Sequence, residues 1–443
     1  MALQGRLSSG GIELNQEFRS ALSIMEGSNK SLFITGRAGT GKSTLLAYFK
    51  SVTSKRIAVL APTGVAALNI GGQTIHSFCR FKPDITPDSV QMLQNASFAA
   101  RNMYKGLDAI VIDEISMVRA DLLDCLDRFM RLNGRSQGAP FGGVQVIFVG
   151  DLYQLPPVVS EGEEGIFKEH YKSPYFFDSN AFKELELGFI ELKGYHRHSD
   201  PKFIGLLNAI RDNTASEMDL QMINERFDPS PGILPAPYLY ITLTTTNSVA
   251  DSINSRHLET IPSSRYAYHA EIKGKFGKGS YPADEILYLK EGAQVMMLNN
   301  DQKRMWVNGS LGKVVSIGGE ADMEGSIGVE LSDGTLISVK PHTWETSKLS
   351  YDIANRKLVS TSIGSFVQYP MMLAWAVTIH KSQGKTFDHI VIDIGDGTFA
   401  HGQLYVALSR CTSLDGIILK RKLQMRHIIM DTMIAKFHKE HFG

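Results

Sequence analysis

The segment at residues 36–43, which reads GRAGTGKS, restricts the fold of this chain more than any other segment. It matches the pattern G-x-x-x-x-G-K-[ST] at each defined position, follows a short apolar run at residues 32–34 and precedes a helix-like stretch. In this context the backbone N–H groups of the loop surround phosphate groups, and the helix N-terminus adds a favourable dipole. The segment therefore predicts a nucleotide site at the end of a buried strand. A glycine-rich turn without a ligand is the alternative.

Two side chains of this loop have specific roles in the prediction. Lys42 supplies a positive charge for the β- and γ-phosphates, and Ser43 offers a hydroxyl group to Mg²⁺. The residues predicted to contact a nucleotide here are Gly36, Ala38, Gly39, Thr40, Gly41, Lys42, Ser43 and Thr44.

Apolar runs alternate with amphipathic stretches along the first half of the chain. The runs at residues 32–34, 57–60, 109–112 and 144–149 are short and apolar, as buried parallel strands are. A second pattern of this kind starts near Phe189. Its strands are expected at residues 239–243, 390–394 and 417–419. This order predicts an α/β fold with parallel sheets.

The length of 443 residues exceeds one ordinary hydrophobic core, so we expect two main α/β domains with insertions. Between residues 294 and 368 lie short alternating strands separated by Asn308-Gly309 and Asp333-Gly334, which are hairpin signals and favour a small β-barrel inserted in the second domain. The expected units are residues 1–11 as a flexible N-terminus, 12–80 and 105–190 as the first core, 81–104 as an insertion, 191–295 and 371–443 as the second core, and 296–370 as the barrel.

Polar side chains follow two of the predicted strands of the first core. Asp113 and Glu114 come directly after residues 109–112, and Gln154 follows residues 144–149. Ligands of open α/β sheets bind beyond the carboxyl ends of the strands, so these side chains are expected in the same crevice as the glycine-rich loop. Asp113 is a candidate for the Mg²⁺ shell, and Glu114 for the base that deprotonates the attacking water. A pair of solvated acids is the alternative. Gln154 is a candidate sensor of the γ-phosphate or a simple polar loop residue.

Hydrolysis of a triphosphate also needs positive charge near the γ-phosphate, and Lys42 is the only convincing source of it in the first core. Arg197 and Arg410 in the second half are candidates for arginines that reach across a domain crevice and make hydrolysis depend on its closure. A surface ion pair is the alternative for each of them.

The composition limits the classes of protein to which the chain belongs. Lys plus Arg number 46 and Asp plus Glu number 46, so the net charge gives no support to nucleic-acid binding, although a local basic groove is compatible with it. No apolar run approaches the ~18 residues that a membrane-spanning helix needs, so we expect no membrane partner. Cys79, Cys125 and Cys411 lie far apart without metal-ligand spacing, and the first eleven residues lack a signal peptide's apolar region. An intracellular, reducing compartment is therefore expected.

Further motifs occur in one order along nearly the whole chain. They are APTGVAA at residues 61–67, TIHSF at 74–78, FGG at 141–143, QLPPV at 154–158, WAVTIHKSQG at 375–384 and LYVALSR at 404–410. With the glycine-rich loop and the acidic pair, they resemble the superfamily-one, class B DNA helicases of the PIF family, which are related to the RecD and Dda motors. The resemblance extends over about residues 12–425.

This resemblance implies two RecA-like domains with ATP and Mg²⁺ between them and single-stranded DNA across both. It implies that Arg197 and Arg410 act across the domain crevice, and that Gln383 and Gly384 couple the nucleotide to the strand. The barrel would be Src-homology-like, and residues 81–104 would carry a strand-separating wedge. The implied function is an ATP-dependent DNA helicase that moves 5′ to 3′ as a monomer on single-stranded, forked and quadruplex DNA, with family roles in repair, recombination and telomere maintenance. It would be cytoplasmic in a bacterium and nuclear in a eukaryote.

The sequence departs from the family pattern at the adenine site. The position of the family's adenine-binding glutamine is occupied by Phe18, and Gln16 lies two residues before it. We therefore expect Gln16 to contact the base. Residues 121–131 have only a loose likeness to the family's signature helix.

A motor must release its strand at each step, which contacts from hydroxyls, amides and a few rings permit better than many lysines. The candidate DNA-binding residues lie in loops after strands and are Thr63, His76, Ser77, Phe78, Pro156, Thr246, Asn247, Thr378, His380 and Lys381. The alternatives are a core ring for Phe78, a satisfied buried histidine for His76 and a rigid turn for Pro156.

Two other functions stay open at this stage. A P-loop phosphotransferase or metabolic ATPase would use the glycine-rich loop but not the second α/β half or residues 380–383. A non-catalytic strand-binding protein would keep a nucleotide only as a structural ligand, and Glu114 argues against it. Stimulation of ATP hydrolysis by DNA separates all three.

Overall fold

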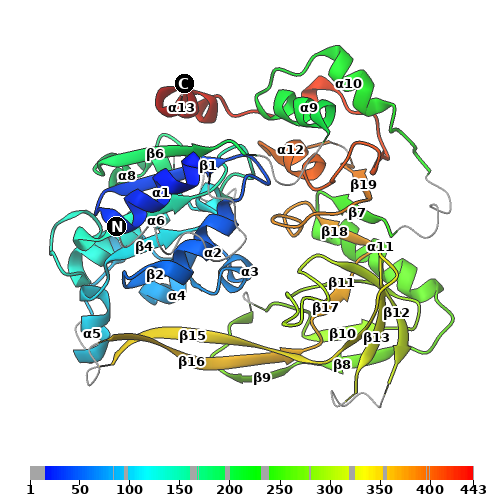
Figure 1. Ribbon diagram of the computed structural model, residues 1–443, viewed down its shortest axis with the longest axis horizontal. Coiled ribbons are helices and arrows are strands. Elements are labelled where there is room, and N and C mark those ends of the chain that lie inside the picture. The colour runs from blue at the N-terminus through cyan, green and yellow to red at the C-terminus, as the bar shows by residue number, and fades with distance from the viewer. Residues whose placement is uncertain are drawn as a thin grey trace.

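Over the residues that it describes, the computed structural model contains two parallel β-sheets and three antiparallel ones (Figure 1). The described residues are 15–82, 84–93, 98–159, 167, 169–194, 200–230, 239–278, 281–318, 325–352, 357–395, 397–398 and 400–442. The predicted flexible N-terminus, residues 1–11, lies outside them.

The first sheet has the order β3-β2-β4-β5-β1-β6, and all of its pairings are parallel. Its strands are β1 (Ser31–Gly36), β2 (Ile57–Ala61), β3 (Gln73–Thr74), β4 (Ala109–Ile112), β5 (Gln145–Val149) and β6 (Leu187–Leu192). Its helices are α1 (Gln16–Gly27), α2 (Lys42–Val52), α3 (Gly64–Asn69), α4 (Ile75–Cys79), α5 (Phe98–Lys105), α6 (Ala120–Asn133) and α8 (Asn180–Lys183). We call residues 15–194 the first lobe.

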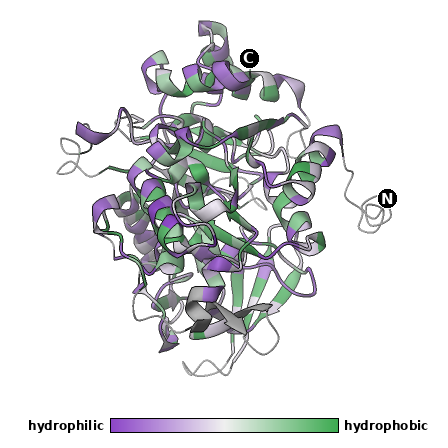
Figure 2. Ribbon diagram, turned by 90° about the vertical axis from the view of Figure 1, so that its left-hand side faces the viewer, coloured by the Kyte–Doolittle hydropathy of each residue, from purple (hydrophilic) through white to green (hydrophobic). Residues whose placement is uncertain are grey.

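Both faces of this sheet are covered. Successive residues of a strand point to opposite faces. In β1, Phe33 belongs to one apolar cluster, whereas Leu32 and Ile34 belong to a second cluster that includes Leu45 and Phe49 of α2. All three β1 residues are fully buried. This is why the strand reads as a continuous apolar run in the sequence. Figure 2 shows the strands largely in green, the hydrophobic colour, among helices that carry purple, hydrophilic positions.

The second parallel sheet has the order β18-β7-β19-β20. Its strands are β7 (Ile241–Thr244), β18 (Ala376–Thr378), β19 (Ile390–Asp393) and β20 (Ile417–Leu419). Its helices are α9 (Pro201–Arg211), α10 (Glu217–Asn224), α11 (Asn247–Thr260) and α12 (Gln403–Leu408). We call residues 200–265 and 374–430 the second lobe. The α/β fold with parallel sheets is therefore confirmed.

The expectation that the second α/β unit begins near Phe189 was wrong. Phe189 lies in β6, which pairs in parallel with β1 from Ser31–Leu187 to Gly36–Leu192 and is the last strand of the first sheet. An isolated apolar run gives no indication of the sheet that it joins, because sheet membership is decided by packing at long range.

Antiparallel strands form an insertion in the second lobe. They are β8 (Tyr266–His269), β9 (Glu271–Gly274), β10 (Ile286–Leu289), β11 (Gln294–Met297), β12 (Leu311–Ile317), β13 (Ile327–Leu331), β14 (Leu336–Val339), β15 (His342–Asp352), β16 (Lys357–Gln368) and β17 (Met371–Leu373). We call residues 266–373 the β-insertion. Among the described residues its strands form the sheets β14-β13-β12-β11-β17, β15-β16-β9 and β10-β8, so closure into one barrel is not confirmed. The insertion also begins earlier than the expected residue 296.

The β-insertion touches the first lobe. The long hairpin β15–β16 extends beneath the first lobe as far as α5 (Figure 1). Asn308 of the insertion donates a hydrogen bond from Nδ2 to Oδ1 of Asn69, at the end of α3, over 3.0 Å. The β-insertion therefore contacts the first lobe at the end of α3 and at α5.

The last helix, α13 (Thr432–Phe442), packs on the first lobe, although the sequence-based division assigns residues 371–443 to the second core. The ring of Phe437 stacks on Phe177, with centroids 4.4 Å apart. Just before the helix, Asp431 accepts a hydrogen bond from the Tyr175 hydroxyl of the first lobe over 2.9 Å. Its own N–H donates to Nδ1 of His401 in the second lobe over 3.0 Å. Asp431 is thus fixed to both lobes at the point where the chain returns.

None of the described helices has the length and apolar character needed to cross a membrane.

Candidate active site

The glycine-rich loop follows β1 and ends in the first turn of α2. Gly39 and Gly41 have φ angles of 82° and 90°, a region that glycine enters without the steric cost of a side chain. The Lys42 Nζ donates to the carbonyl oxygens of Gly36 at 2.7 Å and Arg37 at 3.0 Å. The ammonium group therefore lies back over the loop. Ser43 and Thr44 are exposed at the start of α2.

The two acids after β4 lie near enough to Lys42 for their charges to interact with it. Burial lowers the pKa of Lys42, and the carboxylates of Asp151, Glu114 and Asp113 oppose this effect. Burial likewise raises the pKa of Asp113, and burial together with the charge of Asp113 raises the pKa of Glu114 to about 7. The charges of Lys42, Asp113 and Glu114 are therefore close enough to influence one another, and a crevice that they share stays a prediction.

The backbone of Glu114 is in the left-handed region, with φ 50° and ψ 43°. A non-glycine residue there carries a conformational cost that the surrounding structure must offset. The next residues, Ile115–Met117, form a 3₁₀ turn packed against the loop after β5. A Cβ on Gly150 would lie 2.9 Å from Cγ2 of Ile115, so only glycine permits this approach. The acid is thus held in a fixed, strained position.

The loop after β5 brings the first lobe into contact with the second. Asp151 is fully buried and accepts a hydrogen bond from Nε2 of Gln154 over 3.2 Å. The Gln154 Oε1 in turn accepts from Nε2 of Gln383 in the second lobe over 3.4 Å. Gly384, with φ 75°, follows in an open turn. The structure therefore brings Gln154 and Gln383 together across the lobes, as their motifs indicate.

Arg410 is not a surface residue. It is 1% exposed, and its guanidinium donates to the Val406 carbonyl at 2.9 Å, the Lys385 carbonyl at 3.3 Å and the Ser409 hydroxyl at 2.8 Å. The alternative of a surface ion pair is therefore excluded for Arg410. Its charge also reaches Glu114, where it opposes the rise in pKa caused by burial. Arg197 lies outside the described residues.

Two residues of the second lobe that contact loops of the first lobe were not predicted as site residues from the sequence. The Tyr405 hydroxyl of α12 accepts a hydrogen bond from the Ala38 N–H of the glycine-rich loop over 3.1 Å and lies 3.5 Å from Oδ2 of Asp151. The side chain of Arg211, at the end of α9, lies over the Tyr153 ring with Cζ 3.8 Å from its centroid. Tyr405 is within a recognised motif, but an arginine in the last turn of a helix is common and gives no functional signal.

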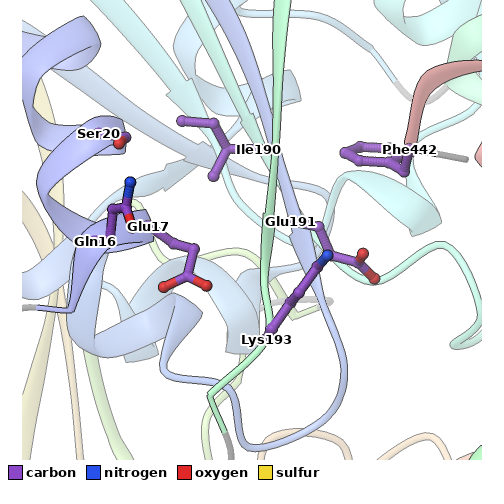
Figure 3. Close-up of a pocket in the computed structure, with 7 residues that line it drawn as sticks. All are labelled: Gln16, Glu17, Ser20, Ile190, Glu191, Lys193 and Phe442. Carbon is purple, nitrogen blue, oxygen red and sulfur yellow. The ribbon is translucent and has the colours of Figure 1, made fainter.

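Gln16 lines a pocket of about 350 Å³ between α1, β6 and α13 (Figure 3). Ser20 and Glu17 of α1 share the pocket, as do Lys193 after β6 and Phe442 of α13. Lys193 is one residue beyond Leu192, which pairs with Gly36, the first residue of the glycine-rich loop. Phe18, in contrast, is 3% exposed and belongs to the apolar core. Of the two residues considered in the sequence, only Gln16 is available to a ligand.

The predicted strand-binding residues have mixed environments. Thr63 and Thr246 are exposed N-caps of α3 and α11, which accept from Ala66 N–H at 3.2 Å and Val249 N–H at 3.5 Å. Ser77 is exposed and lines a groove of about 520 Å³ between α3, α4 and the β-insertion. The remaining accessible candidates are Asn247 and Lys381, which are exposed, and His76, Pro156 and His380, which are partly buried.

Two of these predictions were wrong. Phe78 is 2% exposed, and its ring contacts Tyr104 edge-on at 5.3 Å, so it is the core ring of the alternative reading. Thr378 is 4% exposed, and its Oγ1 accepts from the N–H of Lys381 over 3.2 Å. Its hydroxyl therefore closes the turn after β18. Neither residue's exposure can be inferred from its position in a motif.

Comparison with known proteins gives consistent similarities. Residues 13–219 match the family of PIF1-like helicases, and residues 373–414 match the UvrD-like helicase C-terminal domain. The chain is 32% identical over 453 residues to the ATP-dependent DNA helicase Pif1 of Bdellovibrio bacteriovorus, covering 98% of this chain and 93% of that protein. It is 34% identical over 416 residues to the human ATP-dependent DNA helicase PIF1. That match covers 91% of this chain but only 60% of the human protein.

Solved structures agree with these matches. A Bacteroides sp. Pif1 in complex with ADP-AlF4 superimposes with a TM-score of 0.88 at 35% identity, over 97% of each chain. A Bacteroides Pif1 bound to single-stranded DNA, at the same identity and coverage, gives a TM-score of 0.70. The arrangement of this chain is therefore nearer to that of the first structure.

Proposed function

This chain belongs to the PIF1-like helicase family, and from that premise we propose that it is an ATP-dependent DNA helicase. It hydrolyses ATP between the lobes, moves 5′ to 3′ along single-stranded DNA and displaces the complementary strand. The observation that carries the proposal is that both lobes contribute to one crevice. Gln383 meets Gln154, and Tyr405 meets Ala38 of the glycine-rich loop.

Each of the residues in the crevice has a separate role in ATP hydrolysis. Lys42 attracts the β- and γ-phosphates, and Glu114 takes a proton from the attacking water. Gln154 orients that water and responds to loss of the γ-phosphate. Arg410 adds positive charge from the second lobe, and we assign the same role to Arg197 because of its motif.

The donor groups present fit Mg²⁺. The hydroxyl of Ser43 and the carboxylate of Asp113 are the hard oxygen ligands that this ion prefers. Burial raises the pKa of Asp113 and that of its neighbour Glu114, so a cation beside them would stabilise their charged forms. When bound, the ion neutralises charge that develops on the phosphates.

Single-stranded and forked DNA are the proposed partners. The exposed hydroxyl and amide groups of Thr63, Ser77, Thr246 and Asn247 offer contacts to a phosphate backbone without requiring a basic surplus. Because Ser77 lines the groove that the β-insertion closes on one side, the insertion is a second wall for the strand. We further propose a monomeric motor that works in the cytoplasm of a bacterial cell or the nucleus of a eukaryotic one.

We propose a domain division that follows the sheets. Residues 12–80 and 105–192 form the first core, and residues 81–104 form the wedge insertion. The second core begins before α9 and is interrupted by the β-insertion. The contact between α5 and β15 supports this assignment, because it connects the proposed wedge to the β-insertion, which lines the groove.

A strand-displacement assay tests the proposed function and its direction together. We expect the protein with ATP to open a duplex carrying a 5′ single-stranded tail and to leave one with only a 3′ tail closed. A duplex with blunt ends is the control. Opening of the 3′-tailed duplex alone would contradict the direction. ATP hydrolysis that DNA does not stimulate would favour a metabolic ATPase instead.

Replacing Gln16 with alanine tests the base pocket. The hydrogen bonds that an amide side chain makes to adenine contribute about 0.5–1.5 kcal/mol of net binding free energy. Their loss corresponds to a roughly 2- to 12-fold higher KM for ATP. Because this binding is equal in ground and transition states, kcat should stay unchanged. The measurement is the ratio of kcat/KM for ATP to that for GTP, which should fall. Gln221, exposed on α10, provides the matched control. An unchanged ratio would exclude Gln16 from base recognition.

A further inference from the structure

The C-terminal end of α9 connects two loops of the first lobe that surround the phosphate site. Arg211, the last residue of the helix, donates to Asp212 with Nη1 2.9 Å from Oδ1. The other oxygen of Asp212, Oδ2, lies 3.6 Å from Nη2 of Arg37 in the glycine-rich loop. On its other side Arg211 faces Asp151 and Tyr153, in the loop after β5. One helix end of the second lobe thus reaches both loops.

Packing alone does not account for the position of Arg211. Its side chain is 1% exposed, and within the described part of the chain its Nε and Nη2 have no hydrogen-bond partner. A guanidinium group buried with idle donors is costly unless a nearby charge compensates it. Asp212 pairs only with Nη1, and the charge that faces Nη2 is that of Asp151, with Oδ1 3.9 Å from Nη2. Burial is the largest single influence and acts to lower the pKa of Arg211, but Asp151, Tyr405, Asp212 and Tyr153 together outweigh it, and the pKa is raised.

Asp151 in turn organises the loop that carries Gln154. The carboxylate is 0% exposed and accepts from the Tyr153 N–H at 3.1 Å and from Nε2 of Gln154 at 3.2 Å. Removal of Arg211 would leave this buried carboxylate without its counter-charge from the second lobe. A buried charge that loses its partner moves toward water or takes up a proton. Either change would release the Gln154 amide.

We propose that Arg211 is a positioning residue for ATP hydrolysis, which holds Asp151 and, through it, Gln154. The assignment rests on the proposed function, because it gives Gln154 the task of orienting the attacking water. Arg211 belongs to the second lobe and Asp151 to the first, so Gln154 is held in place only while the lobes are closed. A small further closure would turn the 3.9 Å ion pair into hydrogen bonds, using the idle Nη2 donor.

The test compares Arg211→Gln and Arg211→Lys with the wild-type protein. Loss of a group that orients a reacting residue typically costs 10- to 100-fold in activity. We expect Arg211→Gln to lower kcat for ATP by roughly this factor, with the KM for ATP and the affinity for single-stranded DNA nearly unchanged. Arg211→Lys should recover part of kcat, because lysine restores the charge but not the planar contact with Tyr153. Arg226→Gln, which removes another ion-paired arginine of the second lobe, is the matched control.

A double-mutant cycle with Asp151→Asn separates positioning from general destabilisation. If Arg211 acts through Asp151, the double variant Arg211→Gln/Asp151→Asn should be no slower than the slower single variant. The double variant also leaves no unpaired buried charge, so it is expected to fold even if Arg211→Gln alone does not.

Three outcomes would overturn the assignment: an unchanged kcat in Arg211→Gln, effects that multiply in the double variant, or a parallel loss of kcat, ATP binding and melting temperature. These outcomes differ from failure of the proposed function. Wild-type protein that hydrolyses ATP without stimulation by DNA would refute the helicase but would still permit the cycle on its basal activity.

Discussion

Replacement of Lys42 by alanine is expected to lower DNA-stimulated ATP hydrolysis by at least about 10³-fold, since a preorganised charge at the transferred phosphate is worth this much or more. The Lys42 ammonium lies over the glycine-rich loop, within 3.0 Å of two of its carbonyl groups. With a nucleotide present, it would exchange these carbonyls for phosphate oxygens. Strand displacement should be lost with hydrolysis. The measurements are phosphate release and unwinding of a 5′-tailed duplex.

The same variant should keep most of its affinity for single-stranded DNA. The exposed candidates for strand contact, such as Thr63 and Ser77, lie outside the loop that holds Lys42. Binding to a fluorescent oligonucleotide without ATP is the readout. Lys30→Ala is the control, because Lys30 precedes β1 at its opposite end and forms an exposed ion pair with Glu186. Loss of DNA binding together with hydrolysis would show that Lys42→Ala damages the fold, and retained hydrolysis would exclude the loop as the phosphate site.

Replacement of Glu114 by glutamine is the second large expected effect. A general base contributes roughly 10²- to 10⁴-fold to the rate, and glutamine fills the same space without accepting the proton. We therefore expect kcat to fall by this factor while ATP still binds. Glu186→Gln, on an exposed side chain, is the control. A kcat within a few-fold of wild type would assign the base to another residue.

Glu114 also predicts the pH dependence of wild-type hydrolysis. Burial, and then the charge of Asp113, raise the pKa of Glu114 to about 7. A base works only in its ionised form, so activity is present above this pKa and lost as the pH falls through it. The kcat/KM for ATP, which reports on the free enzyme, should fall about tenfold per pH unit below about 7 and level off above it. A profile that is flat down to about pH 5.5 would contradict the role of Glu114.

Much of the fold can be predicted from the sequence because each buried parallel strand is a short run of consecutive apolar residues. Residues 32–34, 109–112 and 146–149 are continuous apolar runs, because both faces of the first sheet are covered. Such a run does not indicate which other strand it pairs with. The run at residues 187–192 therefore gave no indication that it belongs to the first sheet, and nothing in α13 revealed that it packs across the lobe boundary.

Some residues of the candidate site could be predicted from the sequence and others could not. Lys42 was found from the motif of the glycine-rich loop. Asp113 and Glu114 were found because they directly follow β4, and strand ends determine where side chains meet. Arg211 was not found because its role depends on a contact with Asp151, sixty positions away in the sequence and on another lobe. Phe78 was misassigned because a motif specifies residue type but not exposure.

The return of α13 to the first lobe has a mechanical consequence. The backbone passes from one lobe to the other between β6 and α9, and comes back at Asp431, which is fastened on both sides. A single backbone crossing would allow the two lobes to rotate relative to each other about any axis. Two backbone crossings define an axis, and rotation of the lobes about that axis stretches neither crossing. We therefore expect opening and closing of the lobes to be a rotation about the axis through these two crossings.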